Sequence, residues 1–413
     1  MLHGDGATAT TMRIPRFLTV LFSLLIISGV VCFIVGVLGK DPLRAWQAYL
    51  VNFLFWAGLS FGAVLLVAVL NITGARWGRP LKRFGEAFGA FLPVAFVFFL
   101  LLYFGRFELF PWIRDPVPGR EMWLNAPFLF IRNGIGLLLL SAIAVAMIFF
   151  SLESDRQWRI SLPDGEGTIT SEGPWAAGWR KQQILSPVMA IAYAFVLTLL
   201  AFDLIMSLDR HWYSTLLGGY FLVGSFYTGI VAIYLLALIA GRTEVFKACL
   251  GPRHSHDMGK LVLAFCLFTG YLFYAQFLTI WYGNLPEETR YVILRVKLTP
   301  WEPLAWLTLA MVFLLPFITL LSRRIKLKRL PMILLSLVIL VGMWSERFIL
   351  VVPSLWKRNG IPLGMTEALI TAGYLGIVGL CVTGFLARVP SIPVSDPLFR
   401  EAMAMNNKER LEP

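Results

Sequence analysis

Three ionisable side chains that lie close together in the sequence, Asp203, Asp209 and His211, are suited to proton transfer. An imidazole titrates near neutral pH, and a neighbouring carboxylate can relay the protons that it accepts. Asp203 ends a long apolar run, and the other two stand in the turn that follows. We therefore predict Asp209 and His211 as candidate catalytic residues and Asp203 as part of a proton path.

Four further polar residues interrupt long apolar runs: Arg132, Gln276, Glu346 and Arg347. A charged or strongly polar side chain inside a membrane is costly unless it is paired or hydrated, so each one is a candidate functional residue. We place all four in the same proton path. The alternative is that these residues form buried ties between helices, which fix the packing and take no part in transport.

The partners of these charges are predicted from depth in the membrane. Glu346 and Arg347 are adjacent and project from different faces of a helix, so we expect each to pair with a residue on another helix. The expected partner of Glu346 is Arg132. The expected partner of Asp203 is Arg347 or Arg210.

Aromatic residues near the same turn can form an apolar slot for a planar ring. We predict Trp212, Tyr213, Tyr274 and Trp281 as the contacts of such a ring. Membrane interfaces also collect Trp and Tyr, so their abundance alone does not decide between a ring site and an interface.

The elements that position these residues follow from composition. The chain has 413 residues, of which 58% are hydrophobic and only 15% charged, which excludes a soluble globular protein. Runs of spanning length are typical of helices, whereas barrel strands alternate in segments of about ten residues. The sequence predicts an all-α integral membrane protein with ten spans: Phe17–Val37, Leu50–Leu70, Phe88–Gly105, Phe128–Phe150, Leu185–Ser207, Leu216–Ala240, Leu261–Tyr282, Pro303–Leu321, Leu330–Val352 and Met365–Ala387.

The basic residues predict the orientation. Of the 36 Lys and Arg residues, 23 fall on the side of the amino terminus, 11 fall on the other side, and Arg132 and Arg347 lie within spans. This bias predicts that both termini lie in the cytoplasm. The predicted parts are a cytoplasmic segment 1–16, a membrane domain 17–387 with a cytoplasmic loop 151–184, and a cytoplasmic tail 388–413. Basic residues spread over separate loops argue against nucleic-acid binding.

Two extramembrane segments carry side chains suited to contacts. Trp158, Trp175 and Trp179 lie in the loop 151–184 and suit an interface or a partner. Phe399, Met403 and Met405 in the tail favour a short helix that lies on a neighbour. A plain solvated loop is the alternative for both segments.

The sequence shows no metal-binding pattern. The four cysteines occur without any Cys-x-x-Cys, and the four histidines do not lie as paired ligands within apolar helices. We therefore predict no metal site and no redox centre in this chain.

Two motifs carry a family resemblance. The stretch Asp203–Thr215, followed by Gly218–Phe221, resembles the turn between helices 5 and 6 of NrfD-like membrane subunits of alternative complex III, and Tyr274–Thr289 resembles the end of helix 7 in the same subunits. The chain length is more similar to the ActF-like subunit than to its longer ActC-like partner.

The resemblance implies two four-helix bundles, helices 2–5 and 6–9, with one peripheral helix at each end of the chain. It also implies a hetero-oligomeric quinol-oxidising complex in the inner membrane of a bacterium. Quinol oxidation there releases two protons, and the electrons pass to an iron–sulfur subunit and c-type haem subunits. The quinol site of such complexes is tied to the ActC-like subunit, while the ActF-like subunit supplies a scaffold or a proton path.

Two other functions stay open. A purely structural anchor predicts that changes in the polar residues affect assembly alone. A secondary transporter predicts matched pairs of interrupted helices near the midplane. Pro93 and Pro316 lie inside spans but form no such matched pair in the sequence.

Overall fold

The computed structural model describes residues 11–160, 173, 175–241, 243, 246 and 249–403. Ten stretches of helix in these ranges are long and apolar enough to cross a membrane, and the described residues contain no strand. The predicted all-helical membrane protein with ten spans is therefore confirmed for this part of the chain. The spans are formed by α1 (Arg16–Leu38), α2 (Pro42–Ile72), α3 (Lys82–Gly89) with α4 (Leu92–Leu101), α7 (Ala126–Ile160), α8 (Ala176–Leu204), α9 (Leu216–Ala240), α11 (Pro252–Gly283), α13 (Trp301–Leu309) with α14 (Leu315–Leu321), α16 (Arg329–Leu355) and α17 (Met365–Arg388).

Shorter elements connect or extend these spans. A 3₁₀ turn η1 precedes α3, a second one, η2, follows α8, and a π-helical turn η3 joins α13 to α14. The bounds of the short elements are η1 (Arg79–Leu81), α5 (Arg106–Leu109), α6 (Pro111–Arg114), η2 (Met206–Leu208), α12 (Pro286–Val296), η3 (Ala310–Leu314) and α15 (Arg323–Lys326).

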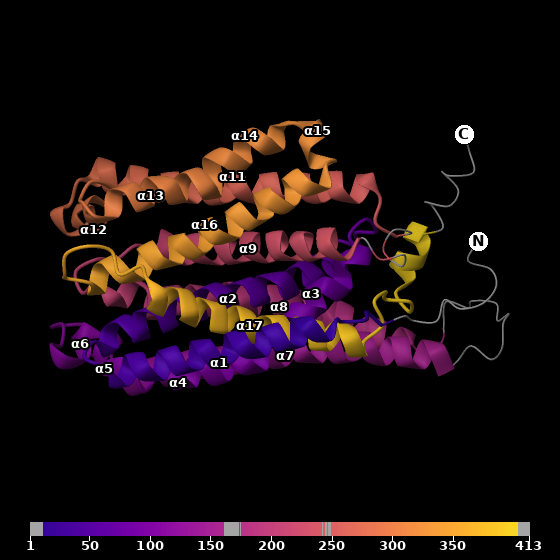
Figure 1. Ribbon diagram of the computed structural model, residues 1–413, viewed down its shortest axis with the longest axis horizontal. Helices are drawn as coiled ribbons and strands as arrows, with labels where there is room; N and C mark the ends of the chain where they lie inside the picture. The colour runs from indigo at the N-terminus through magenta and orange to yellow at the C-terminus, as the bar shows by residue number, and fades with distance from the viewer. Residues whose placement is uncertain are drawn as a thin grey trace.

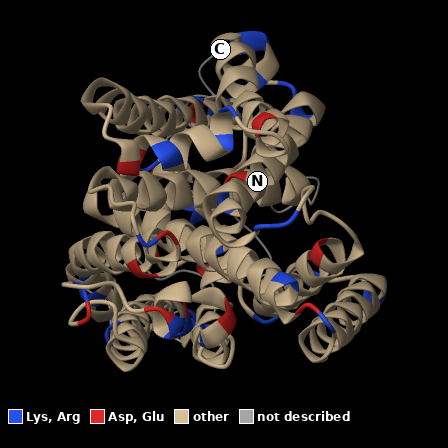
Figure 2. Ribbon diagram, turned by 90° about the vertical axis from the view of Figure 1, so that its left-hand side faces the viewer, with Lys and Arg blue, Asp and Glu red and all other residues tan. Residues whose placement is uncertain are grey.

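The spans lie side by side along the long axis of the molecule (Figure 1). The two ends of the described chain meet at one end of that axis, where the backbone N–H of Met12 donates to the carbonyl of Leu386 (3.2 Å). We call this end the termini face. The elements α5, α6 and α12 lie at the other end, the opposite face. Figure 2 looks onto the opposite face and shows charged residues on several of the connections there.

Helix α2 forms the centre of the molecule. It is buried along almost its whole length and packs against α8, α9, α16 and α17. Helices α1 and α17 pack against each other, and Gly29 is the one residue of α1 that is buried. The predicted division into two four-helix bundles stays a prediction, because α2 contacts helices from both predicted groups.

Glycine residues allow the closest of these helix crossings. A Cβ atom on Gly29 of α1 would lie 2.5 Å from the Cα of Gly373 on α17. A Cβ on Gly229 of α9 would lie 2.4 Å from the backbone nitrogen of Ala63 on α2. Small residues at such contacts are a general means of packing helices in membranes, where lipid removes most of the hydrophobic drive.

The third span differs from its predicted range. We predicted Phe88–Gly105, whereas helix extends over Arg79–Leu101. The sequence interpretation started the span after the charged residues, because unpaired charges are costly in a membrane. In the structure the cations at its start are buried in ion pairs, so the helix continues through them.

The loop 151–184 also contains more helix than predicted, since α7 continues to Ile160 and α8 begins at Ala176. Residues 397–403 of the tail are helical, and the guanidinium of Arg400 lies over the rings of Trp158 (4.2 Å) and Trp175 (4.9 Å). These tryptophans therefore contact the tail of their own chain. Residues 161–172, and Met405 in the tail, lie outside the described residues.

Both prolines noted within spans coincide with irregular helix. Pro93 is the second residue of α4, which follows a break from α3, and Pro316 follows the π-helical turn η3. Because Pro316 has no N–H, it leaves the carbonyl of Val312 without its helical donor. The hydroxyl of Tyr227 (3.4 Å) and the thiol of Cys266 (3.6 Å) donate to that carbonyl instead. Neighbouring side chains thus compensate for the irregularity inside the membrane.

Candidate functional site

The carboxylate of Asp203 is the centre of the first charged cluster. Asp203 is fully buried near the end of α8. It accepts hydrogen bonds from Arg132 Nε (2.7 Å) and Arg132 Nη2, and from Asn133 Nδ2 (2.5 Å), both residues of α7. The guanidinium also lies over the rings of Trp123 (3.8 Å) and Phe128 (4.6 Å). This bidentate pair neutralises two charges in the half of the molecule nearer the opposite face.

The second cluster lies on α16. Arg347 Nη1 donates to Glu346 Oε2 (2.7 Å), and Arg347 Nη2 donates to the carbonyl of Phe221 (3.4 Å) and to Ser225 Oγ (3.3 Å) on α9. A Cβ on Gly224 would lie 3.1 Å from Arg347 Nη2, so this glycine makes room for the guanidinium. The buried Glu346 Oε1 accepts no hydrogen bond that meets standard geometry.

The predicted partners of these charges are wrong. Arg132 pairs with Asp203 rather than with Glu346, and Glu346 pairs with its own neighbour Arg347. Arg210 pairs with Asp115 at the opposite face. The prediction treated adjacent helix residues as unable to meet, but the long Arg347 side chain reaches back along its own helix.

The residues of the turn after α8 do not join the Asp203 cluster. The carboxylate of Asp209 accepts the backbone N–H of His211 (3.2 Å). The side chain of His211 is exposed, as is that of Tyr213, whereas Trp212 is buried. None of these side chains shares a hydrogen bond or an ion pair with the Asp203 cluster.

Trp212 belongs to a stack that the sequence interpretation missed. Its ring stacks on Tyr291 of α12 with centroids 3.6 Å apart and planes 6° apart, and the guanidinium of Arg295 lies 3.3 Å from the Tyr291 centroid. Because both neighbours lie so close to one ring, Tyr291 is held between them. The stack fixes α12 against the turn after α8.

Arg295 also connects α12 to a proline in α16. Pro353 has no N–H, so the carbonyl of Ile349 loses its helical donor. Arg295 Nε donates to that carbonyl (2.9 Å), and Arg295 Nη2 donates to the carbonyl of Leu350 (3.2 Å) and to Ser354 Oγ (2.7 Å). The buried cation thereby replaces the missing backbone donor.

The remaining predicted residues lie on α11. Tyr274 and Trp281 are seven residues apart on one face of the helix, and both are exposed. Gln276 is half-buried. Among the described residues, no hydrogen bond or ion pair joins these three side chains to the Asp203 cluster.

A buried ionic network near the termini face was also missed. Arg83 of α3 forms ion pairs with Glu86 of the same helix and with Asp155 near the end of α7. Arg79 Nη1 and Lys82 Nζ both lie 3.2 Å from Asp396 Oδ2 in the tail. Each of these side chains is at most 3% exposed.

The sequence contains a signal for this network. Arg79, Lys82, Arg83 and Glu86 are spaced at i, i+3, i+4 and i+7, so they share one face of a helix. The sequence interpretation counted the cations as an orientation signal alone. Their acidic partner Asp396 is more than 300 residues away, and nothing local connects it to them.

The tail carboxylate has a shifted pKa. Burial by itself raises the pKa of Asp396, but the charges of Lys82 and Arg79 outweigh this effect and hold the pKa below its ordinary value. Hydrogen bonds from Lys82 Nζ (3.2 Å) and from the backbone N–H of Phe399 (3.4 Å) act in the same direction. Asp396 is therefore ionised at neutral pH and ties the tail to η1 and α3.

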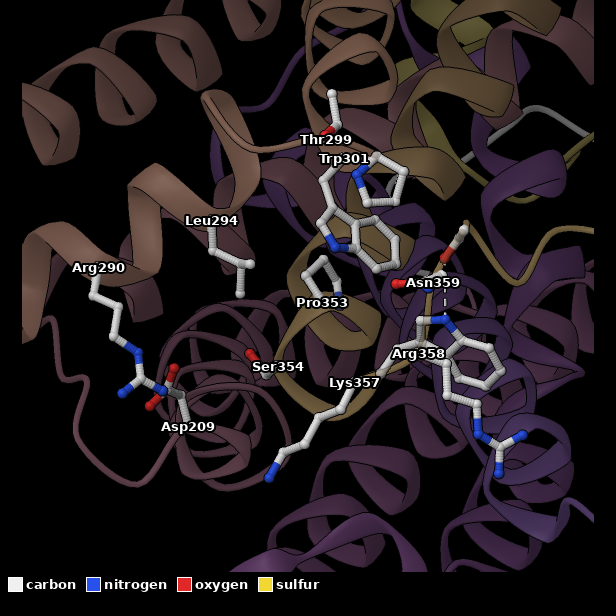
Figure 3. A pocket seen from close by; sticks show the side chains of 13 residues that line it. Asp209, Arg290, Leu294, Thr299, Trp301, Pro353, Ser354, Lys357, Arg358 and Asn359 are labelled. Atoms are coloured by element: carbon white, nitrogen blue, oxygen red, sulfur yellow. Dashed lines mark hydrogen bonds between the residues drawn. The ribbon is translucent and has the colours of Figure 1, made fainter.

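A cleft of about 520 Å³ opens on the opposite face (Figure 3). It lies between α12, the turn after η2, the start of α13 and the residues that follow α16. Its charged lining residues are Asp209, Arg290, Lys357 and Arg358. Among the described residues, no group of three or more His, Cys, Asp or Glu side chains is arranged to hold a metal ion.

The family model described as polysulphide reductase, NrfD, matches residues 36–357. This chain belongs to the NrfD family. NrfD proteins are typically quinone-interacting membrane anchors of redox complexes that contain iron–sulfur and cytochrome subunits. No curated protein matches the chain significantly.

The NrfD match includes most of the features described above. It runs from the end of α1 through α16 and so includes both charged clusters and the stack. It also includes the cleft, except for the lining residues Arg358, Asn359 and Gly360. Helix α17 and the tail follow the matched range, and Asp396 therefore lies outside it. The network near the termini face combines residues of the NrfD region with one carboxylate from beyond it.

Proposed function

We propose that this chain is the ActF-like membrane subunit of an alternative complex III in a bacterial inner membrane, with both termini in the cytoplasm. The observation that carries the proposal is the NrfD match over α2 to α16. The two motifs, in the turn after α8 and at the end of α11, support the finer assignment. The excess of Lys and Arg on the membrane side that carries both termini supports the orientation.

The partners follow from this assignment. An ActC-like membrane subunit lies beside the chain, and an iron–sulfur subunit and c-type haem subunits dock at the opposite face. Quinol oxidation releases two protons and passes two electrons to the iron–sulfur subunit, so the redox centres belong to the partners. This chain contributes a membrane scaffold and groups that move protons.

The proposed proton path uses the two buried charged clusters. The carboxylates of Asp203 and Glu346 are its proton carriers, with Arg132 and Arg347 as their counter-charges. Gln276 stays a candidate without a contact that supports it. Asp209 and His211 lie at the opposite face, where they can pass protons to water.

The proposed quinone contacts divide by exposure. Tyr274 and Trp281 face outward from α11, so a ring that arrives from the bilayer can reach them. Tyr213 is exposed at the turn. Trp212 is enclosed in its stack with Tyr291, so it acts by holding α12 in place rather than by touching the ring.

The test is turnover per assembled complex. Asp203→Asn should lower quinol-dependent reduction of the acceptor about 10-fold or more, because proton transfer by a positioned group contributes at least that much. The matched control is Asp115→Asn, an exposed carboxylate at the opposite face that pairs with Arg210. The control should keep normal turnover.

A second variant separates chemistry from folding. Asp203→Asn leaves the cation of Arg132 without its partner, which can impair assembly. The double variant Arg132→Gln with Asp203→Asn removes both charges and should assemble, yet it should remain slow. Normal turnover in the assembled double variant would refute the proton role and favour a purely structural anchor.

A further inference from the structure

The cleft on the opposite face lies at the expected boundary between membrane and water. Trp301 is the first residue of α13, and Trp356 directly follows α16. Both line the cleft. Tryptophan at the ends of membrane helices marks the level of the lipid headgroups. A ligand in this cleft therefore sits at headgroup depth.

The cleft carries an excess of positive charge. Three cations, Arg290, Lys357 and Arg358, line it together with one carboxylate, Asp209. Arg358 has its own partner, since its Nη1 lies 2.6 Å from Asp41 Oδ2. Arg290 and Lys357 form no ion pair with any residue that the structure describes. In Figure 3 Arg290 and Lys357 extend toward the side of the cleft where Asp209 lies, whereas Arg358 extends away from it.

An apolar groove adjoins this cleft. The groove has a volume of about 470 Å³ and is formed mainly by α12 and the residue Leu298. It shares Arg290 and Leu294 with the cleft, so the two spaces meet along one helix. Pro286, Arg290 and Ile293 recur at helical spacing on the groove face of α12.

The other face of α12 is anchored. Tyr291 and Arg295 are buried and bind the turn after α8 and the end of α16. The groove face is thus held in place and exposed, with Ile293 42% and Leu298 48% accessible. An apolar groove that leads into a cationic cleft matches a molecule with an anionic head and an apolar chain.

We propose that the cleft and the groove together bind one acidic phospholipid. Its phosphate lies between Arg290 and Lys357, and an acyl chain follows the groove along α12. A quinone ring is neutral and would add no negative charge to offset the excess of cations in the cleft. An acidic peptide would satisfy the cations but leave the groove unfilled.

The experiment measures lipid binding to the purified full-length protein after lipids are removed in detergent. Phosphatidylglycerol, phosphatidylcholine and inorganic phosphate are titrated separately and followed by native mass spectrometry. Phosphatidylglycerol should bind tightest. Arg290→Gln and Lys357→Gln should each weaken it about five-fold, the effect expected for one cation near a lipid surface. The control Lys297→Gln, an exposed cation outside the cleft, should leave binding unchanged.

Variants in the groove test the acyl chain. Ile293→Ser should weaken phosphatidylglycerol binding about three-fold by removing apolar contact. The control Leu285→Ser changes a similarly exposed residue that does not line the groove. It should have no effect.

Four outcomes would overturn the proposal. Equal binding of phosphatidylcholine would show that the cations do not select the headgroup. Inorganic phosphate that competes as well as the lipid, with no effect of Ile293→Ser, would show a simple anion site. Unchanged binding in both cation variants would place the lipid elsewhere. Carbodiimide cross-links from Lys357 to an acidic partner subunit in the intact complex would assign the cleft to a protein.

Discussion

The contact between Arg295 and the end of α16 allows a quantitative test of how a proline is tolerated in this helix. Pro353 removes the N–H that would donate to the carbonyl of Ile349, and Arg295 Nε donates to it instead at 2.9 Å. We predict that Arg295→Met destabilises the protein strongly while Pro353 is present and less when residue 353 is alanine.

The magnitude follows from that one carbonyl. A buried acceptor left without a donor costs about 1–3 kcal/mol. In the Pro353→Ala background the alanine N–H donates to Ile349, so that cost of removing Arg295 disappears. The other contacts of Arg295, with Tyr291 and Ser354, are lost in both backgrounds and cancel. The expected coupling energy between the two substitutions is therefore about 1–3 kcal/mol.

The assay is the free energy of unfolding of the purified chain in mixed micelles, measured for the wild type, both single variants and the double variant. Lys297→Met is the matched control, because it changes an exposed cation that directly follows α12. Its effect should be the same with either residue at position 353. If Arg295→Met and Pro353→Ala add within about 0.5 kcal/mol, the compensation is refuted.

Three further predictions concern other parts of the chain. Gly224→Ala should lower thermal stability because its Cβ would lie 3.1 Å from Arg347 Nη2, whereas Gly219→Ala, whose Cβ meets no atom within 4 Å, should not. An equal loss of stability in both variants would contradict this. Because the pKa of Asp396 is lowered, this carboxylate should stabilise the docked tail fully at neutral pH. The stabilisation should be lost only in acid, as the pH falls below the ordinary carboxylate pKa toward the lowered pKa of Asp396. Limited proteolysis of the tail at a series of pH values measures this loss. Asp396→Asn should release the tail at neutral pH, and a tail that stays protected would rule this out. Burial raises the pKa of Cys249 to about 11 from an ordinary value of 9.0, so maleimide should label it about 100-fold more slowly at pH 7 than an exposed cysteine, with peptide mass spectrometry as the readout.

The sequence predicted the spans well and their polar extensions poorly. Apolar runs set where helices cross, because an unpaired backbone group in lipid is costly for any other structure. The third span was placed too late in the chain because Arg79, Lys82 and Arg83 were read as loop charges. Their ion partners, Asp155 and Asp396, lie in other elements, and only packing brings them near.

The same distinction holds for the candidate site. The sequence identified Arg132, Asp203, Glu346 and Arg347 as unusual, because charge is rare in membrane helices. It did not determine which pairs form. The rotation of each helix about its axis and the length of the arginine side chain decide which pairs form. Neither can be read from the order of residues in the sequence.

The amino-acid sequence by itself determined that this chain has ten membrane-spanning helices and that a few charged residues lie within them. Hydrophobic length and the cost of burying charge are local properties, so they can be counted residue by residue. The tertiary structure decided the rest: the tail carboxylate of Asp396 that enters the network near the termini face, and the cationic cleft beside α12. Those features depend on residues far apart in the chain meeting in space, which only the packing of the helices fixes.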